Sequence, residues 1–540
     1  MKGLATMGRP LWGKILVSCL IGVVRIAASM GFVWVCKALV DIATGDSSEP
    51  LGLHVGIMIG IMLVQVLSSV AYGWWEGMLV TRTQNSFRAN VFGHVLWSEW
   101  NGREAFHSGD MVNRLEEDTG VVVDLLCTRV PDFIVTLVQL LAASCFLFAL
   151  EPQLLWVLLI LMPVAVIGSK MFFKTIRKLT ALIRAKDSEI QGHMQENLQQ
   201  RVLVKTLGCE DTVLEKLDSM QDDVMSNTIK RLNYNAGARG FLRIGFMAGY
   251  AAAFLWGVFG IKSGAVTFGM MTAFLQLVGQ VQRPIADISR HIPAFIHSLT
   301  SVERLLELTD LPLEPEGEDV MMEGAPGIRI DDVTFAYSDV PEGVKPLKVF
   351  DHFSYDFKPG TVTAVMGVTG AGKSTLTRLA LALLRPSVGS VMLYSGGREV
   401  PSSPSTRCNF RYVPQGNSLM SGTVRENLLL ANPDATEDEM KEALHLAVAD
   451  FLLDLPDGLD TVCSEKGSGL SEGQAQRIAI ARALLHSGGV LILDEATSAL
   501  DRDTEDELLR RISKISGGKT ILWITHREAV TSIADAVLKI

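Results

Sequence analysis

The chain has 540 residues, of which 48% are hydrophobic and only 20% are charged, and its net charge is -10. Its length allows two or more domains, and its mean hydropathy of +0.28 is high for a soluble protein. The acidic balance argues against a nucleic-acid partner, because such binders usually present a basic face. The seven cysteines form no CxxC pair, which indicates free thiols in a reducing compartment.

Long uncharged stretches dominate the first 310 residues. Each is about 18–22 residues long, enough for a helix to cross about 30 Å of hydrocarbon. We therefore predict six membrane-spanning helices: Ile15–Cys36, Val55–Trp75, Phe133–Leu150, Pro152–Ser169, Ile244–Ile261 and Ser263–Gln282. The first stretch is too long for a signal peptide and lacks a cleavage site, so we expect it to be retained.

The connections between these stretches alternate between short and long. The long ones, 76–132 and 170–243, are charged but contain few helix breakers, so we expect the membrane helices to continue beyond the membrane. They also carry many lysines and arginines, whereas the short connections hold essentially one, Lys262, so the positive-inside rule assigns the long connections to the cytoplasm. We predict an integral plasma-membrane or inner-membrane protein with six spans and both termini in the cytoplasm.

Arg25 is the one charge inside the first stretch. A charge about 15 Å into a bilayer is costly and usually faces a cavity or a partner. A structural ion pair or snorkelling to the interface remains an alternative. We predict that Arg25 faces a translocation cavity and meets an anionic group of the substrate.

The character of the chain changes after residue 310. Residues 311–326 are acidic and contain prolines, as expected of a linker. From 327 to 540, apolar strand-like runs alternate with helical ones, which predicts an α/β domain. The strand-like runs lie within 328–337, 361–368, 410–415, 490–496 and 519–526.

A glycine-rich loop follows the second of these strands and precedes a helical run. Gly367, Gly370 and Gly372 lead into Lys373 and Ser374, the spacing of a phosphate-binding P-loop. Glycines allow the backbone N–H groups to surround phosphate oxygens at the start of a helix. Lys373 is expected to reach the β- and γ-phosphates of ATP, and Ser374 to ligate Mg²⁺.

A second apolar strand ends in two carboxylates, Asp494 and Glu495. At this distance after a P-loop, the pattern assigns Asp494 to Mg²⁺, usually through water, and Glu495 to the attacking water as general base. The two motifs together predict an ATP-hydrolysing site.

Further motifs in 328–540 resemble the ATP-binding cassette (ABC) ATPase family. Leu470 to Gln474 resembles its signature motif, and Ser498 to Asp501 resembles its D-loop. The resemblance implies nucleotide and Mg²⁺ contacts, with catalytic roles for Lys373, Gln415, Glu495 and His526. The implied nucleotide contacts are Tyr337 on adenine, Gly367, Gly370, Gly372, Lys373, Ser374, Thr375, Gln415, Ser471, Gly473, Gln474, Asp494 and Asp501. The implied Mg²⁺ ligands are Ser374, Gln415 and Asp494.

Residues 1–310 resemble the membrane domain of type IV ABC exporters. In that family, short coupling helices lie at the cytoplasmic turns, here near Trp100–Gly109 and Gly208–Leu217. A P-loop holds ATP from one side, and the partner's signature motif closes the other. One cassette with six spans therefore implies a half-transporter that works as a homodimer or with a second half-transporter.

Two departures from the family pattern stand out. Glu472 occupies a glycine position of the signature, where an acid would repel a partner's γ-phosphate unless it points away. The chain stops at Ile540 within a strand-like run that family members usually extend.

The resemblance favours an exporter of a lipid, hydrophobic compound or peptide, with membrane lipids as its surroundings. An importer with the exporter fold and an ATP-gated sensor or channel remain alternatives.

Overall fold

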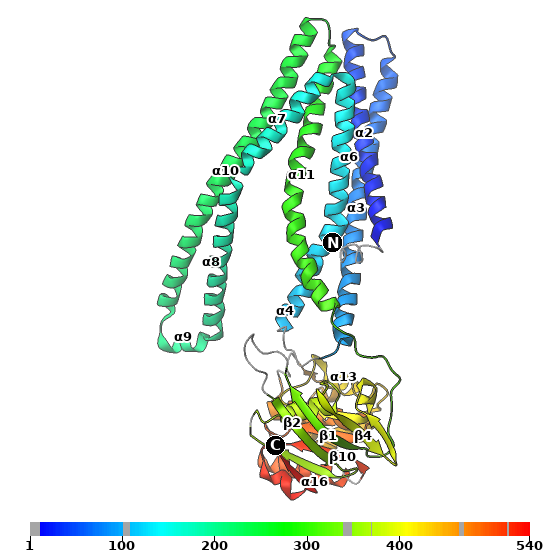
Figure 1. Cartoon of the computed structure of the whole chain (residues 1–540), viewed down its shortest axis with the longest axis vertical. Coiled ribbons are helices and arrows are strands. Elements are labelled where there is room, and N and C mark those ends of the chain that lie inside the picture. The colour runs from blue at the N-terminus through cyan, green and yellow to red at the C-terminus, as the bar shows by residue number, and fades with distance from the viewer. Residues whose placement is uncertain (1–10, 101–107, 338–347, 369, 464–468, 516–517) are drawn as a thin grey trace. The chain divides into compact units, whose positions relative to one another are not determined.

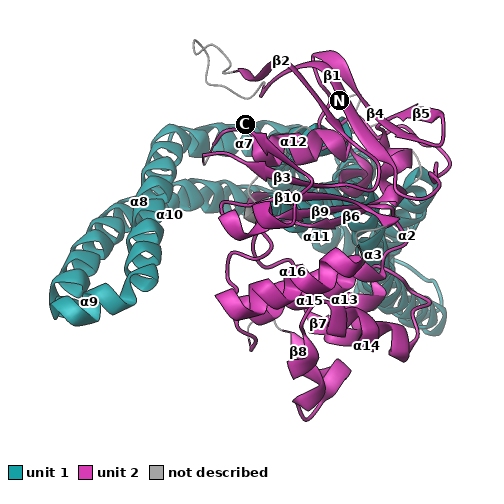
Figure 2. Ribbon diagram, turned by 90° about the horizontal axis from the view of Figure 1, so that it is seen from below, with its two compact units in different colours: residues 1–93, 111–310 teal, residues 94–110, 311–540 magenta. Residues whose placement is uncertain are grey.

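The computed structural model describes residues 11–100, 108–337, 348–368, 370–463, 469–515 and 518–540. The chain forms two compact units, residues 1–93 with 111–310 and residues 94–110 with 311–540 (Figure 2). The division at 310 lies where the sequence predicts the linker to begin. The grouping of 94–110 and 311–326 with the second unit was not predicted. It has a local cause, because Ser98 forms an antiparallel bridge with Leu313.

The first unit is entirely helical in its described part. Five of its six longest apolar elements each contain one predicted span, and the sixth contains all but the first five residues of Ser263–Gln282 (Figure 1). They are α2 (Trp12–Thr44), α3 (Leu51–Trp97), α6 (Val130–Leu150), α7 (Pro152–Lys170), α10 (Glu210–Lys262) and α11 (Phe268–Thr309). The 53 residues of α10 reach about 80 Å, far more than the hydrocarbon thickness. The predicted continuation of helices beyond the membrane is thus present.

Further helical elements connect these apolar helices. Before α6 lie α4 (Ser108–Asn113), the π-helical turn η2 (Arg114–Asp118), α5 (Thr119–Asp124) and the π-helical turn η3 (Leu125–Arg129). Between α7 and α10 lie α8 (Phe173–Gln199) and α9 (Arg201–Leu207).

Five of these helical segments in the described part are long and apolar enough to cross a membrane: Trp12–Thr44, Leu51–Trp97, Asp110–Leu150, Pro152–Lys170 and Glu210–Lys262. The sixth predicted span, Ser263–Gln282, lies in α11 from Phe268 onward, and α11 falls outside this group. Its glutamines, among them Gln276, Gln280 and Gln282, lower its hydropathy.

Small residues allow α10 to pack closely against its neighbours. Gly245, Gly249, Ala253 and Gly257 recur every four residues and lie buried on one face of the helix. A methyl group on Gly249 would lie 1.7 Å from the side-chain nitrogen of Gln282 on α11. Inside a membrane, helices associate through such close backbone approach rather than through hydrophobic burial.

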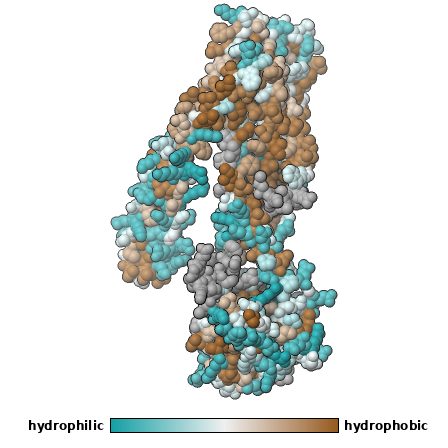
Figure 3. Space-filling view, viewed as in Figure 1, coloured by the Kyte–Doolittle hydropathy of each residue, from teal (hydrophilic) through white to brown (hydrophobic). Residues whose placement is uncertain are grey.

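The outer surface of the long helices is apolar. In the space-filling view, hydrophobic surface covers much of the upper part of this unit, whereas the far ends of α8 and α10 are mainly polar (Figure 3). On α3, Leu63, Leu67 and Val70 are each more than half exposed. Exposed apolar side chains on a helix of this length are suited to contact with lipid tails.

The second coupling helix was predicted as a short helix near Gly208–Leu217. The structure has its short helix just before this position, as α9 (Arg201–Leu207), and the predicted range instead contains the start of α10 at Glu210. Gly208 adopts φ = 61° and ends α9 as a left-handed C-cap, a conformation that favours glycine. The first coupling helix, placed near Trp100–Gly109, lies mostly outside the described residues.

The second unit contains two main sheets. The first is parallel, with strand order β11-β3-β10-β9-β6, and the second is antiparallel, with order β2-β1-β4-β5. The parallel strands are β3 (Val362–Met366), β6 (Phe410–Val413), β9 (Val490–Asp494), β10 (Thr520–Ile524) and β11 (Ala536–Lys539). The antiparallel strands are β1 (Gly327–Ala336), β2 (Lys348–Phe357), β4 (Val388–Ser395) and β5 (Arg398–Pro401). The five predicted strands are confirmed.

Helices and a small two-stranded antiparallel sheet complete this unit. They are α12 (Lys373–Ala380), α13 (Val424–Leu429), α14 (Glu437–Leu446), α15 (Glu472–Leu485), α16 (Arg502–Ile515), and the strands β7 (Gly422–Thr423) and β8 (Val462–Cys463). The central strands β9 and β10 are buried along their whole length, which explains their continuous apolar sequence. Their carboxyl ends lie beside the P-loop strand β3, because β10 pairs in parallel with both β3 and β9.

Candidate active site

The P-loop runs from β3 into α12, as the sequence predicted. Gly370 and Gly372 adopt φ values of 86° and 103°, which other residues rarely reach. A methyl group on Gly372 would also lie 2.6 Å from a side-chain carbon of Val349. The glycines therefore permit both the sharp turn and the close packing that bring the backbone N–H groups around a phosphate.

Lys373 lies folded over this loop. Its ammonium donates to the carbonyl of Gly367 at 2.8 Å and lies 2.8 Å from Nε2 of His526. It is also 3.9 Å from a carboxylate oxygen of Glu495. The predicted catalytic lysine, histidine and glutamate thus form one cluster at the carboxyl ends of neighbouring strands.

Glu495 stands at the centre of the cluster. One carboxylate oxygen accepts from the Gln415 amide at 2.6 Å, and the other lies 3.0 Å from Nε2 of His526. The residue has φ = 50°, an unusual value for a non-glycine residue. Such strain costs roughly 1–3 kcal/mol and is found where function requires a fixed side-chain position. Here it aims the carboxylate at the loop.

A cavity of about 330 Å³ opens beside this cluster. Its lining comes from the P-loop, the β1–β2 region and the two predicted catalytic residues Gln415 and Glu495. The lining residues are Tyr337, Val349, Gly370, Gly372, Lys373, Ser374, Thr375, Gln415 and Glu495. It therefore unites much of the predicted nucleotide-contact set.

Asp494 lies at the end of β9 and is only 3% exposed. Burial raises the pKa of its carboxyl group, and the neighbouring charge of Glu495 raises it further. Tyr412 hydrogen-bonds to this carboxyl, and burial raises the pKa of the phenol to about 12. A buried, partly destabilised carboxylate is one whose charge a bound cation would stabilise.

The chemistry of the site fits Mg²⁺. Ser374 offers a hydroxyl, Gln415 an amide carbonyl and Asp494 a carboxylate, and oxygen donors are the ligands this hard cation prefers. Ser374 and Gln415 both line the cavity. Asp494 immediately precedes Glu495, another lining residue.

Tyr337, the predicted adenine contact, lies at the edge of the same cavity. Its hydroxyl is 3.0 Å from the hydroxyl of Thr375 and accepts from Arg378 at 3.3 Å. Its ring packs edge-to-face against Phe335, with centroids 5.0 Å apart. Two side chains thus hold the hydroxyl of Tyr337, and a third packs against its ring.

The predicted signature residues begin α15. Ser471 caps the helix, and its hydroxyl accepts from the backbone N–H of Gln474, whose side chain accepts in return from the N–H of Ser471. A methyl group on Gly473 would lie 2.8 Å from the carbonyl oxygen of Ala499, so this position requires glycine. Glu472 is exposed in the first turn, where the helix dipole stabilises its charge.

The carboxylate of Asp501 caps the start of α16 within this chain. It accepts from the backbone N–H of Thr504 at 2.9 Å and from its hydroxyl at 2.8 Å, at the start of α16. Ser471, Gly473, Gln474 and Asp501 are all absent from the described lining of the P-loop cavity.

Sequence reasoning missed Arg527, the residue after His526. Its guanidinium donates to the carbonyls of Ser498 and Leu500 at 2.9 and 3.1 Å and pairs with Glu505 at 2.5 Å. Glu505 is 2% exposed. This ties the D-loop backbone to the segment that carries the histidine. The signal available in the sequence was that Arg527, a cationic residue, directly follows the predicted catalytic histidine.

Arg25 is partly buried on α2, and its guanidinium lies 5.1 Å from the ring centroid of Tyr72 on α3. The Tyr72 hydroxyl donates to Asp132 at 2.9 Å. This aromatic partner could not be identified from the sequence, because cation–π contacts have no fixed spacing.

A membrane-spanning helical unit joined to a P-loop ATPase defines an ATP-driven transporter. Residues 15–285 match the family of ABC transporter transmembrane regions, and residues 350–498 match the ABC transporter ATPase family. The chain belongs to the ABC transporter family, as an ATP-hydrolysing transporter chain that binds nucleotide and is integral to a membrane.

Curated relatives align over nearly the whole chain. A putative multidrug export ATP-binding/permease protein of Bacillus subtilis is 26% identical, covering 100% of this chain and 94% of the relative. An ATP-dependent lipid A-core flippase of Vibrio cholerae is 26% identical, covering 99% of this chain and 92% of the relative. A bacterial Atm1-family ABC exporter solved with ATP bound has the same fold, with a TM-score of 0.80 and 22% identity, covering 98% and 93% of the two chains.

Proposed function

We propose that two copies of this chain form the working exporter and that each ATP site is completed by the partner. The P-loop cavity supports this proposal, because its described lining contains Lys373 and Glu495 but neither Ser471 nor Gly473. A second copy would bring its signature helix to the open side of the bound ATP. Since one chain carries both halves of a site, a homodimer is the simpler assembly, although a second half-transporter could also serve.

Within this site, each residue has a proposed task. The P-loop amides and Lys373 hold the phosphates, and Tyr337 stacks on adenine. Glu495 accepts the proton of the attacking water, while Gln415 and His526 orient its carboxylate through the contacts described above. Neutral His526 can donate to Glu495 or accept from Lys373, depending on its tautomer. When bound, Mg²⁺ would neutralise phosphate charge, and Ser374, Gln415 and Asp494 would hold it.

The proposed topology has six spans in the plasma or inner membrane, with both termini in the cytoplasm. The sixth span would be formed by the first half of α11, whose Phe274, Leu277 and Val281 lie in the helical core. Its glutamines would face other helices rather than lipid, as Gln282 does against Gly249.

The proposed substrate is amphipathic or hydrophobic, such as a lipid, a hydrophobic compound or a peptide. The names of the relatives support this class, since they refer to multidrug export and to lipid A-core flipping. The apolar outer surface of the first unit supports membrane lipids as its surroundings.

Mixed dimers test the shared site. We expect Lys373→Ala and Ser471→Ala each to abolish ATP hydrolysis when present in both copies. A mixed dimer contains one Lys373→Ala chain and one Ser471→Ala chain and is purified through a different tag on each. It should regain about one intact ATP site. The reason is that the unchanged P-loop of one copy then faces the unchanged signature of the other. Inactivity of correctly folded mixed dimers would contradict the shared site.

Transport in vesicles tests direction and coupling. Inside-out vesicles containing the chain should accumulate a fluorescent lipid or hydrophobic dye when ATP is added, and the Glu495→Gln variant should not. Accumulation in right-side-out vesicles with internal ATP would instead indicate an importer. Hydrolysis without any flux would indicate an ATP-gated sensor or channel.

We also propose that Arg25 faces the translocation cavity and binds an anionic group of the substrate. Arg25→Lys should retain partial transport, whereas Arg25→Ala should keep basal ATPase activity but lose its stimulation by substrate. Tyr72→Phe is the matched control, because it retains the ring beside Arg25 and removes only the hydroxyl that binds Asp132. An unchanged ratio of stimulated to basal activity in Arg25→Ala would overturn the assignment.

A further inference from the structure

The three residues after α3 are fixed to the ATPase unit. The backbone N–H of Glu99 donates to the carbonyl of Pro312 at 2.8 Å, and the N–H of Glu314 donates to that of Trp97 at 2.9 Å. Glu99 also forms an ion pair with Arg385 at 2.7 Å. This segment therefore belongs structurally to the ATPase unit, although the sequence analysis assigned it to the membrane domain.

Trp100 lies beside the helix that follows the P-loop. The guanidinium of Arg378 on α12 lies 4.8 Å from the ring centroid of Trp100, a cation–π distance. Trp100 also packs against the apolar core that contains Phe335, Leu376 and Leu384. The Trp100 ring is thus one of the groups that hold the Arg378 guanidinium in position.

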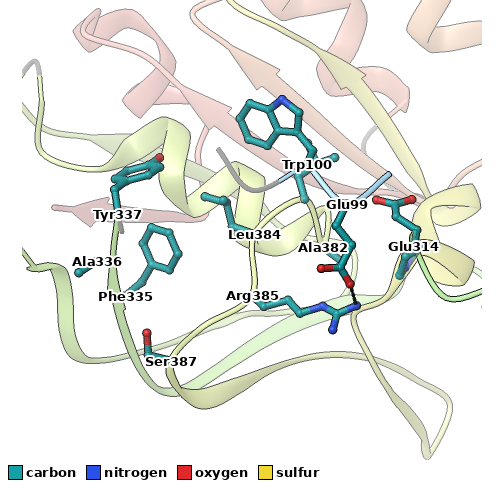
Figure 4. A pocket seen from close by; sticks show the side chains of 12 residues that line it. Glu99, Trp100, Glu314, Phe335, Ala336, Tyr337, Ala382, Leu384, Arg385 and Ser387 are labelled. Atoms are coloured by element: carbon teal, nitrogen blue, oxygen red, sulfur yellow. Dashed lines mark ion pairs between the residues drawn. The ribbon is translucent and has the colours of Figure 1, made fainter. Parts of the chain in front are cut away.

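Arg378 connects Trp100 to the nucleotide cavity. It donates to the hydroxyl of Tyr337 at 3.3 Å, and that hydroxyl lies 3.0 Å from the hydroxyl of Thr375. Trp100 and Tyr337 line a second cavity of about 340 Å³, in which Glu99 and Arg385 lie opposite Phe335 and Tyr337 (Figure 4). Tyr337 lines both this cavity and the nucleotide cavity.

We propose that Trp100 is a positioning residue for the adenine-stacking Tyr337, acting through Arg378. Trp100 holds the guanidinium, and the guanidinium together with Thr375 fixes the phenol ring at the edge of the ATP site. The proposal deepens the proposed function, because it rests on Tyr337 as the adenine contact. Trp100 follows α3 by three residues, and α3 is one continuous helix of 47 residues that begins at Leu51. Trp100 therefore lies close in the chain to a helix that is long and apolar enough to cross a membrane.

Equilibrium binding without Mg²⁺, in which ATP is not hydrolysed, tests this role in the full-length protein. Trp100→Ala should weaken ATP binding about fivefold, the equivalent of about 1 kcal/mol for a partly buried cation–π contact. Binding of inorganic tripolyphosphate should not change, because it has no base to stack on Tyr337. Trp100→Phe should restore most of the affinity for ATP.

Matched variants separate positioning from general damage. Glu99→Gln removes the neighbouring ion pair with Arg385 and should leave ATP affinity unchanged. Arg378→Lys keeps the charge but removes the flat guanidinium, and should weaken ATP selectively, so the test survives if Trp100→Ala fails to fold. The effects of Trp100→Ala and Tyr337→Phe should be non-additive, since both act on the same hydroxyl contact.

Two results would overturn the proposal: equal weakening of ATP and tripolyphosphate, or additive effects of Trp100→Ala and Tyr337→Phe. A different result would count against the proposed function itself. If the unchanged protein bound tripolyphosphate as tightly as ATP, Tyr337 would have no role in binding the base.

Discussion

Replacing Glu495 with glutamine should slow ATP hydrolysis by about 10²–10⁴-fold, the usual contribution of a general base. Glutamine has the same shape but cannot accept the proton of the attacking water. The strained backbone of Glu495 and its contacts with Gln415 and His526 fix this carboxylate close to the P-loop lysine Lys373. ATP should still bind, because the P-loop glycines and Lys373 are unchanged.

Steady-state phosphate release and ATP binding, measured on the same preparation, check this prediction. Glu437→Gln is a suitable control, since Glu437 is an exposed carboxylate on α14 that pairs with Lys441. It should hydrolyse ATP at the normal rate. A normal rate for Glu495→Gln would show that another group accepts the proton.

Features with a local cause could be predicted from the sequence. The P-loop required a strand, glycines in sequence and a helix, and all lie within about twenty residues. The buried strands β9 and β10 were evident because a short, continuous apolar run in an α/β domain is typical of a strand that is covered on both faces. Asp494 and Glu495 could then be assigned because a parallel sheet brings the ends of its strands to one edge.

Features that depend on contacts distant in the sequence could not be predicted. Trp100 and Tyr337 are separated by more than two hundred residues, and nothing in either segment indicates that they share a cavity. Arg25 and Tyr72 are likewise distant in the sequence, and nothing in either segment indicates that they are in contact. The bounds of the short helix before α10 differ from the prediction for another reason. The sequence predicts a short helix that begins near Gly208, whereas the left-handed backbone of Gly208 ends the short helix α9.

The second prediction with a large expected effect concerns Asp494, whose replacement by asparagine should lower activity and raise stability. Asp494→Asn should reduce ATP hydrolysis by at least about 10–100-fold, the usual cost of removing a group that orients a metal through its bound water. The same change should raise the unfolding temperature of the nucleotide-free protein, because burial and the charge of Glu495 make the ionised carboxylate unfavourable in the folded state.

The pH dependence follows from the direction of the pKa shift. The folded-state pKa of Asp494 is raised above the unfolded value, so both states are protonated at low pH and the carboxyl then costs no stability. As pH rises through the unfolded value of about 3.9, the unfolded chain loses its proton first, and the folded state becomes relatively less stable. Above the folded pKa the penalty is constant. Asparagine removes this penalty.

Thermal unfolding of the full-length protein at several pH values, without nucleotide or Mg²⁺, measures this effect. The advantage of Asp494→Asn should be greatest at pH 7–8 and should shrink as the pH falls toward 4. A gain of about 1 kcal/mol would correspond to about 2–4 °C for a unit of this size. Asp503→Asn, on exposed helix α16, is the control and should show no such gain. A variant that is less stable than the unchanged protein at pH 7–8 would mean that the ionised carboxylate is stabilised without a cation. In that case the ionised Asp494 carboxylate would stabilise the fold itself, rather than being a destabilised group that a bound metal ion stabilises.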